Sequence, residues 1–311
     1  INNVTGSYVA RIYDPDSVVL SEDGMTVEDS EKLHKYDGAF YSKMSMNVDG
    51  GEAGTGVLNI TADNEGLDTE LHLTINGGTI NITSGNDGIN TNEDNVSVTT
   101  VNGGSVNIQV TGETGEGDGI DSNGWLVING GAVTAAACSN SGDAGIDATM
   151  GITINGGTVT AKAATSGSAQ GAGIGAGSDD IGGVIIITGG IVTATGNDEG
   201  GAGIGAGSCT AVGSTRKDGK IGDITITGGV VNASGGRNSA GIGYGNNCKE
   251  VGPITISGGA VTATGNNTDG IRGYNDETDF STGQDGSALI LASSICLLYT
   301  SPSPRDRQKS R

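Results

Sequence analysis

Aromatic residues are scarce in this chain: Phe, Tyr and Trp together make up 3% of its 311 residues. Large rings supply much of the volume of an ordinary globular core, so a core of that kind is not expected. Long apolar runs are absent too, and none approaches the ~20 residues that a membrane-spanning helix needs. The sequence therefore predicts neither a conventional core nor insertion into a membrane.

Basic residues are also few, since 15 Lys and Arg stand against 36 Asp and Glu, for a formal net charge of −21. A chain this acidic is repelled by phosphate backbones and by anionic lipid headgroups. We therefore expect no nucleic acid and no anionic membrane surface as a direct partner.

Glycine, by contrast, is abundant, with 59 residues, and it marks a repeat. Each repeat carries a Gly-Gly doublet followed by a Gly-Ile, Gly-Leu or similar step. Successive doublets are 27, 26, 27, 26, 33, 39 and 30 residues apart. Such a period is typical of a solenoid. The doublets begin at Gly50, Gly77, Gly103, Gly130, Gly156, Gly189, Gly228 and Gly258, and the later glycines are Gly66, Gly88, Gly119, Gly145, Gly173, Gly203, Gly241 and Gly270.

Apolar residues alternate with polar ones on both sides of the doublets, as Leu73 and Ile75 precede one and Ile80 and Ile82 follow it. Thr99 alone interrupts the alternation before the doublets. Period-two alternation predicts strands, and no stretch shows a helical stripe. We therefore predict an all-β chain folded as a right-handed single-stranded parallel β-helix, a solenoid of about eight coils. The boundaries we expect are an N-terminal cap or irregular first coil at 1–38, acidic coils at 39–160, glycine-rich coils at 161–285 and a foreign, disordered tail at 293–311.

The later glycines of the acidic coils are flanked by carboxylates and amides, which stacking would align in ladders. The candidates are Glu65, Asp68, Asp87, Asn90, Asp118, Asp121 and Asp147. Coils stack ~4.8 Å apart, and two ionised carboxylates at that distance repel by roughly 3 kcal/mol at an effective dielectric constant near 20. Oxygen-only ligands favour calcium, so we predict calcium as the cofactor. Alternatively, these side chains cap turns and point into water.

Beyond residue 160 the later glycine sits in Ala-Gly-Ile-Gly, at 172–175, 202–205 and 240–243, without a carboxylate. The metal prediction therefore ends near residue 150. A second column, Asn76, Asn102, Asn129 and Asn155 before the doublets, predicts a structural ladder of amides.

Four cysteines leave the redox state open. Cys209 and Cys248 follow equivalent glycines of adjacent repeats and could form a disulfide, although free thiols among small residues fit equally well. Cys138 has no evident partner, and Cys296 lies in the tail. No Cys or His spacing suggests zinc.

The runs Glu65-Gly-Leu-Asp68, Asn86-Asp-Gly-Ile-Asn90 and Asp118-Gly-Ile-Asp121 carry a family resemblance. Residues 39–160 resemble the secreted clostridial carbohydrate-binding β-helix family, and the resemblance implies bound calcium and affinity for cellulose and pectin. Residues 165–275 resemble the repeats of Gram-positive surface proteins, and 293–311 resemble a sequencing-adapter read-through. The chain begins at Ile1, which leaves room for a signal peptide upstream, and we expect a secreted or cell-surface protein.

A sugar-binding surface needs an aromatic platform with flanking hydrogen-bonding groups. Trp125, the only tryptophan, shares an outward column with His72, and amides such as that of Asn92 can read hydroxyls. These three residues are the predicted polysaccharide contacts. Trp125 could instead pack against a loop at the edge of its sheet.

Three other functions remain open. A polysaccharide lyase needs a base beside calcium, yet residues 44–160 contain no Lys or Arg and one imidazole, so we expect no enzyme. A structural stalk or adhesin is the main alternative. An outward Thr column also suggests ice binding, and its residues are Thr74, Thr100, Thr153, Thr225 and Thr255. The insertions between later repeats disfavour this function, because they spoil the regular flat face that it needs.

Overall fold

The computed structural model describes residues 4–8, 19–22, 27–29, 38–112, 117–138, 142–164, 170–209, 211–212, 215–216, 219–248, 250–273, 287–292 and 297–299. Within these ranges there is no helix, and nearly all strands pair in parallel. The all-β prediction is confirmed for this part of the chain, and the arrangement is consistent with a β-helix. No helix there could cross a membrane.

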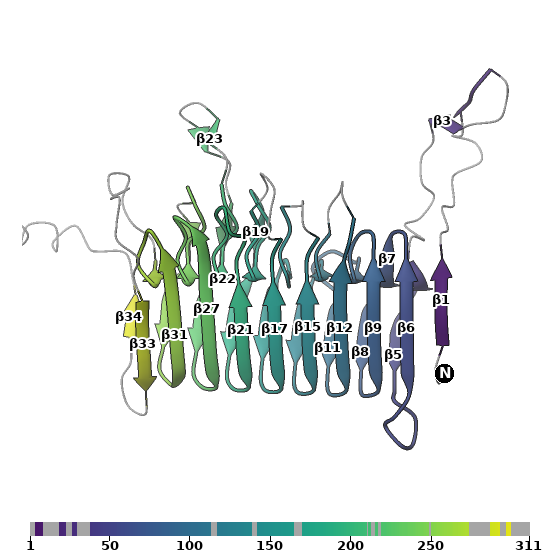
Figure 1. The fold of residues 1–311 in the computed structure, drawn as a ribbon, viewed down its shortest axis with the longest axis horizontal. Helices are drawn as coiled ribbons and strands as arrows, with labels where there is room; N and C mark the ends of the chain where they lie inside the picture. Colours follow the sequence, from purple (N-terminus) through teal and green to yellow (C-terminus); the bar gives the residue numbers. More distant parts are fainter. Residues whose placement is uncertain are drawn as a thin grey trace, which may run out of the picture.

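The widest sheet is ten-stranded and forms one long face (Figure 1). Its order is β1 (Val4–Tyr8), β6 (Val57–Ala62), β9 (Thr79–Ser84), β12 (Ser105–Val110), β15 (Ala132–Ala136), β17 (Thr158–Lys162), β21 (Ile191–Thr195), β27 (Val230–Arg237), β31 (Gly259–Asn266) and β33 (Ser287–Ala292).

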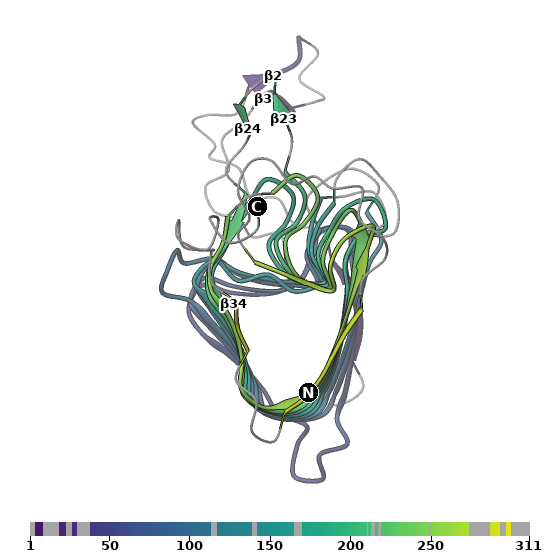
Figure 2. The same cartoon turned by 90° about the vertical axis from the view of Figure 1, so that its left-hand side faces the viewer.

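A nine-stranded sheet forms the second wall. Its order is β5 (Met46–Val48), β8 (His72–Ile75), β11 (Val98–Val101), β14 (Trp125–Ile128), β16 (Gly151–Ile154), β20 (Val184–Ile187), β26 (Ile224–Ile226), β30 (Ile254–Ile256) and β34 (Leu297–Tyr299). Viewed along the stack, the sheets surround one interior (Figure 2).

Shorter strands make the third side. One sheet holds β4 (Gly38–Ser42), β7 (Glu65–Thr69), β10 (Ile89–Thr91) and β13 (Ile120–Ser122), and another holds β18 (Ile174–Gly175), β22 (Ile204–Gly205), β28 (Ile242–Gly243) and β32 (Ile271–Arg272). Parallel bridges through Ile146 connect them. A three-stranded sheet adds β19 (Ile181–Gly182), β25 (Lys220–Ile221) and β29 (Glu250–Val251), and two antiparallel pairs are β2 (Val19–Leu20) with β3 (Val27–Asp29) and β23 (Ala211–Val212) with β24 (Thr215–Arg216).

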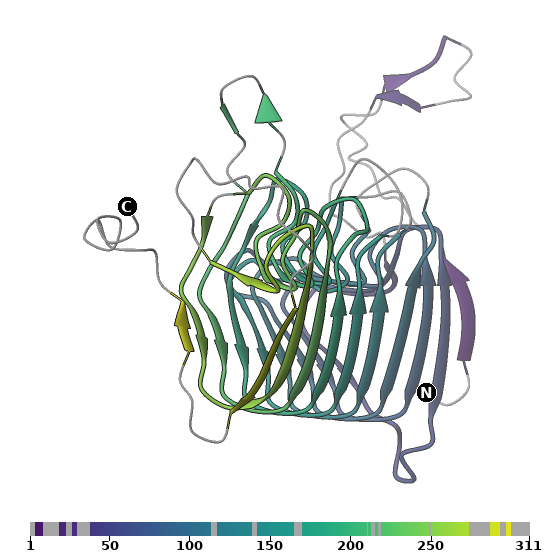
Figure 3. The same ribbon diagram turned by 60° about the vertical axis from the view of Figure 1, so that its left-hand side comes forward.

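The Gly-Gly doublets form the corner between the nine-stranded and the ten-stranded sheets, opposite the third side (Figure 3). The second glycine of every doublet has a positive φ. This conformation is strained for any residue that carries a side chain, and glycine adopts it without that cost. The φ angles are 72° at Gly51, 87° at Gly78, 84° at Gly104, 80° at Gly131, 83° at Gly157, 86° at Gly190, 87° at Gly229 and 88° at Gly259.

The later glycines are required because the next coil lies too close for a side chain. A Cβ atom at Gly66 would lie 2.5 Å from the carbonyl oxygen of Gly88, and one at Gly88 would lie 2.6 Å from that of Gly119. Each repeat of the sequence thus corresponds to one coil, and its glycines lie at the corners of that coil.

The interior consists of stacked aliphatic side chains, such as Leu73, Leu126 and Ile152, all essentially inaccessible to solvent. Thr99, which interrupts this pattern in sequence, has a partner inside. Its hydroxyl donates to Oγ1 of Thr91 at 3.2 Å, and the Thr91 hydroxyl donates to Oγ of Ser122 at 2.8 Å. A buried row of hydroxyls therefore replaces apolar side chains here.

The amide ladder is confirmed. The side-chain amide of Asn102 donates to Asn76 at 2.8 Å, that of Asn129 to Asn102 at 2.9 Å and that of Asn155 to Asn129 at 2.9 Å. The hydroxyl of Thr188 continues the ladder by donating to Asn155 at 2.9 Å. These exposed amides satisfy one another from coil to coil.

The outermost strands fall partly outside the predicted repeats. At one end β1 extends the ten-stranded sheet in parallel, and at the other β33 and β34 pair antiparallel with β31 and β30. Of the predicted tail at 293–311, only Leu297–Tyr299 lies among the described residues. Most of the predicted cap at 1–38 also lies outside them.

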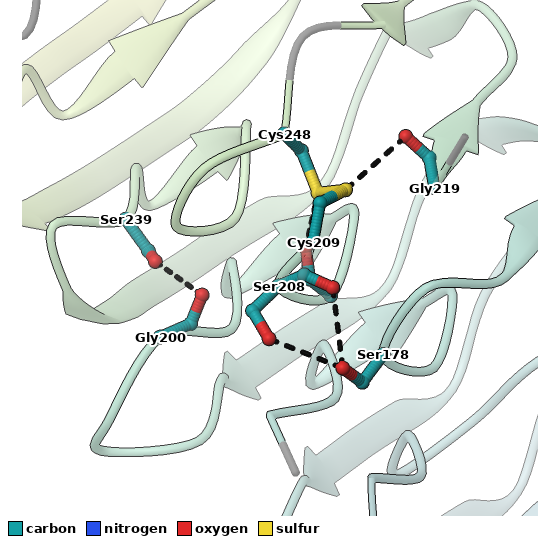
Figure 4. The surroundings of a disulfide bond; sticks show 8 residues. Ser178, Gly200, Ser208, Cys209, Gly219, Ser239 and Cys248 are labelled. Carbon is teal, nitrogen blue, oxygen red and sulfur yellow. Dashed lines mark hydrogen bonds between the residues drawn. A yellow bond between two sulfur atoms is a disulfide. The ribbon is translucent and has the colours of Figure 1, made fainter. Parts of the chain in front are cut away.

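Cys209 and Cys248 form a disulfide between neighbouring coils, with their Cα atoms 4.9 Å apart (Figure 4). Cys138 is a buried free thiol, and Cys296 lies outside the described residues. The bond closes a loop across 39 residues, beside the insertion that carries β23 and β24.

Reducing this disulfide is expected to lower the free energy of unfolding by roughly 2 to 4 kcal/mol, because the unfolded chain regains the freedom that the closed loop removed. The measurement is denaturant unfolding with and without reductant. The variant Cys138→Ser serves as a control and should respond to reductant as the parent does. An unchanged midpoint for the reduced parent would contradict the expectation.

Candidate functional site

The third side of the acidic coils brings the predicted carboxylates and amides into register. Asn90 lies between Asp68 and Asp121 in the sheet of β7, β10 and β13. The bridge between Ile120 and Ile146 continues this register, so Asp147 follows Asp121. The remaining predicted metal ligands, Glu65, Asp87 and Asp118, belong to the neighbouring column on the same side.

The first group of oxygen atoms is buried, and we name it the Asn90 cluster: Glu65, Asp68, Asn86, Asn90 and Asn92. Glu65 and Asn90 are each 3% exposed and Asp68 is 0% exposed. The amide of Asn90 donates to Oε1 of Glu65 at 3.0 Å, and that of Asn92 donates to Oδ1 of Asp68 at 2.6 Å.

The amide oxygens of the Asn90 cluster are not matched by donors. Oδ1 of Asn86, of Asn90 and of Asn92 is buried and accepts no hydrogen bond. A buried acceptor without a donor costs about 1–3 kcal/mol. Three amide oxygens of the cluster therefore lack hydrogen-bond donors.

The second group lines a pocket of about 390 Å³, which we name the aspartate pocket. Its walls come from the acidic coils and from the first glycine-rich coil. The lining residues are Asp87, Asp118, Asp121, Asn123, Asp143, Asp147, Thr149, Gly177, Ser178, Asp179 and Asp180.

The pKa values of Asp87, Asp118 and Asp147 are raised well above the ordinary range of a carboxyl group. Burial is the main cause for each. Neighbouring carboxylates add to it, first Asp121 for Asp87 and for Asp147, and first Asp143 for Asp118. Without a cation, this pocket holds more negative charge than its surroundings stabilise.

Backbone amides compensate part of this charge. The amide of Asp118 donates to Oδ1 of Asp87 at 2.8 Å, and that of Ala148 donates to Oδ1 of Asp147 at 2.6 Å. The amide of Ala144 donates to Asp118. These bonds orient the carboxylates but supply no full positive charge.

The donor set of both groups fits calcium, which binds carboxylate and amide oxygens. In the described part of the chain, however, no three His, Cys, Asp or Glu side chains already converge as a metal site. The oxygens are thus gathered on one side of the coils without being arranged around a single point.

Three carboxylates of the aspartate pocket, those of Asp143, Asp179 and Asp180, were not predicted from the sequence. The metal prediction followed the column of Asp147, which Gly175 occupies in the next coil with a φ of 136°. The acidic residues of this coil come instead from the following turn, at 179–180. The run Ser178-Asp-Asp180 was the available signal.

The predicted sugar contacts separate in the structure. His72, Val98, Trp125 and Gly151 lie in register on the nine-stranded sheet, with the Trp125 side chain 37% exposed. A Cβ atom on Gly151 would lie 3.0 Å from Cζ3 of Trp125, so the indole extends over the neighbouring coil. Asn92 belongs to the Asn90 cluster instead.

Comparison with known proteins identifies a family for this chain. The model of the carbohydrate-binding domain-containing protein family matches residues 12–240, well over half of the chain. The match includes glycine-rich coils that the sequence related to surface-protein repeats. No curated protein and no solved structure matches. The chain belongs to the family of carbohydrate-binding domain-containing proteins.

Proposed function

We propose that this chain is an extracellular, non-catalytic carbohydrate-binding protein that depends on calcium and recognises plant cell-wall polysaccharide such as pectin or cellulose. The fold we infer for it is a right-handed parallel β-helix of about eight coils, since crossovers between parallel strands of one sheet are right-handed in about 98% of cases. The observation that carries the proposal is the gathering, on the acidic coils of a carbohydrate-binding family member, of buried amide oxygens that lack donors and of carboxylates whose pKa values are raised by burial.

Two sets of residues would hold calcium. In the Asn90 cluster, the amide oxygen of Asn90 would gain the partner it lacks, beside the carboxylates of Glu65 and Asp68. In the aspartate pocket, the carboxylates of Asp118 and Asp147 are already oriented by backbone amides. Bound calcium would supply positive charge that offsets the repulsion between coils and can also attract a uronate carboxylate.

Trp125 would supply the apolar part of the sugar contact. A pyranose ring packs its CH face on an indole, and Trp125 is exposed on the nine-stranded sheet beside Val98 and the small Gly151. His72 lies two coils away in the same column. A polysaccharide that follows this column would contact several coils at once.

We expect Trp125→Ala to weaken retention on insoluble polysaccharide about tenfold, which corresponds to about 1.4 kcal/mol. The measurement is depletion of protein from a suspension of insoluble pectin in calcium. Trp125→Phe keeps an aromatic ring and should lose less. Met44→Ala, at an exposed position outside both wide sheets, tests for a general loss of exposed apolar surface. Equal retention of Trp125→Ala and the parent would remove Trp125 from the contact.

Analysis of reaction products distinguishes a binding protein from an enzyme. Residues 44–160 contain no Lys or Arg to serve as a base, and His72 is their only imidazole. We therefore expect no new reducing ends and no unsaturated products after long incubation with polygalacturonate and calcium. If the protein binds neither pectin nor cellulose, a role as a structural stalk or adhesin explains the repeats better than carbohydrate binding does.

A further inference from the structure

The charges of this chain are distributed unevenly between its faces. Carboxylates gather on the third side, around the Asn90 cluster and the aspartate pocket. We name the neutral face the outward positions of the ten-stranded sheet from β6 to β31, up to Ser234 of β27 and Thr264 of β31. Its single charged side chain is that of Lys162, since the exposed Arg237 lies beyond the irregularity that follows Ser234 and pairs with Glu199. The outward positions are Val57, Asn59, Thr61, Thr79, Asn81, Thr83, Ser105, Asn107, Gln109, Ala132, Thr134, Ala136, Thr158, Thr160, Lys162, Ile191, Thr193, Thr195, Val230, Asn232, Ser234, Ala260, Thr262 and Thr264.

The neutral face is also regular. Its strands stay in register from β6 to Ser234 of β27, which pairs with Thr264 of β31. The insertions that lengthen the later repeats lie between β18 and β20, between β22 and β26 and between β28 and β30, where the chain passes from the third side to the nine-stranded sheet (Figure 1). They therefore leave this face intact. The sequence argument about insertions concerned the Thr column, which lies on the nine-stranded sheet, and does not apply to the ten-stranded sheet.

Hydroxyl and amide groups thus recur once per coil, ~4.8 Å apart along the stack. Amides of Asn59, Asn81 and Asn107 are already linked, with Asn81 donating to Asn59 at 2.7 Å and Asn107 donating to Asn81 at 2.9 Å. Further along the same face lie exposed apolar side chains, with Ile191 50% exposed and Val230 45% exposed. The face therefore consists mainly of hydrogen-bonding groups with a few apolar side chains among them.

Solubility alone would favour charged side chains on so wide a surface. The chain as a whole carries many carboxylates, yet none lies on this face. An uncharged face loses little hydration free energy when it is covered, provided that its polar groups find new hydrogen bonds. The partner that matches it is itself uncharged, flat and rich in hydroxyls, and repeats along one direction. Many weak contacts made together then give firm attachment.

We propose that the neutral face is a second carbohydrate-contact surface, which lies against insoluble, uncharged polysaccharide and does not need calcium. This inference rests on the proposed function, and it assigns the uncharged polysaccharide to the ten-stranded sheet while the acidic coils serve uronate-containing chains. No residue of the Asn90 cluster or of the aspartate pocket lies on this face.

The test is depletion of protein from microcrystalline cellulose in excess chelator. The double variant Thr134→Glu with Thr193→Glu puts two carboxylates at the centre of the neutral face, two coils apart, with Thr160 between them. We expect it to reduce retention at least tenfold. The control variant Thr55→Glu with Val96→Glu adds the same charge at exposed positions outside the sheets and should bind like the parent.

A conservative pair, Thr134→Ser with Thr193→Ser, keeps both hydroxyls and should also bind like the parent. Melting temperatures of all variants show whether a loss of retention follows unfolding. Binding of polygalacturonate in calcium should be unchanged in Thr134→Glu with Thr193→Glu, so failure here is distinguishable from failure of the proposed function.

The proposal is overturned if chelator releases the parent from cellulose, or if Thr134→Glu with Thr193→Glu is retained as well as the parent. Ice is another flat, uncharged surface. If the parent reshapes growing ice crystals and is not retained on cellulose in chelator, the neutral face binds ice and the proposal is wrong.

Discussion

Saturating calcium is expected to raise the free energy of unfolding of this protein by about 4.1 kcal/mol for each site that it fills at a thousandfold excess over its dissociation constant. The reason is the buried negative charge on the third side. Burial and neighbouring carboxylates raise the pKa values of Asp87, Asp118 and Asp147. A cation that binds the folded coils removes this cost, and the unfolded chain holds no comparable cluster.

The pH dependence of stability should reverse with calcium. Without calcium, the folded chain keeps protons on Asp87, Asp118 and Asp147 at pH values where the unfolded chain, with carboxyl pKa values near 3.9, has released them. Stability is therefore highest below that value and falls as pH rises through the raised pKa values. With calcium, protons compete with the cation, so stability should rise over the same range.

Thermal unfolding between pH 4 and pH 8, in calcium and in excess chelator, measures both effects. The gap between the two melting temperatures should widen as pH increases. The variant Asp147→Asn should narrow this gap, because it removes a carboxylate of the aspartate pocket, whereas Asp49→Asn, outside that pocket, should not. Identical melting temperatures in calcium and chelator at every pH would contradict the prediction.

Gly104→Ala is expected to destabilise the fold by roughly 4 kcal/mol or more, at the upper end of single substitutions. Gly104 has a φ of 84°, which costs a residue with a side chain on the order of 1–3 kcal/mol. In addition, its Cβ atom would lie 2.6 Å from the carbonyl oxygen of Gly78 in the preceding coil. Backbone on both sides would have to move, because the same corner repeats in every coil.

Gly54→Ala separates these two costs. Gly54 has a φ of 65°, but a Cβ atom there would meet nothing within 4 Å. We therefore expect only the conformational cost, on the order of 1–3 kcal/mol, without the additional cost of a contact between coils. Denaturant unfolding of both variants gives the comparison, and equal losses would mean that contact between coils contributes nothing to the requirement for glycine.

The sequence predicted the sheets and corners because each signal repeats. Eight doublets with alternating neighbours leave one consistent register, and the structure places all of their second glycines at positive φ. The Asn76 ladder could be predicted for the same reason, since identical residues recur at one corner. Cys209 and Cys248 could only be placed at similar corners, and whether they bond depends on the local path of an inserted loop.

The candidate site was less predictable because its later residues leave the repeat. Asp179 and Asp180 reach the aspartate pocket from a turn, and no column of the sequence aligns them with Asp147. The hydrogen-bond partner of Thr99 could not be predicted from the sequence for another reason. Its hydroxyl is satisfied by Thr91, a residue of another sheet, so the interruption of the apolar column made sense only once both walls were known.

The proposed function requires that calcium on the acidic coils enables this protein to bind polysaccharide. Titration of the protein with polygalacturonate oligomers, first in calcium and then in excess chelator, tests it most directly. The account predicts binding in calcium that is lost in chelator and weakened in Asp147→Asn. Binding that is equally strong in chelator, or no binding in calcium, would contradict it.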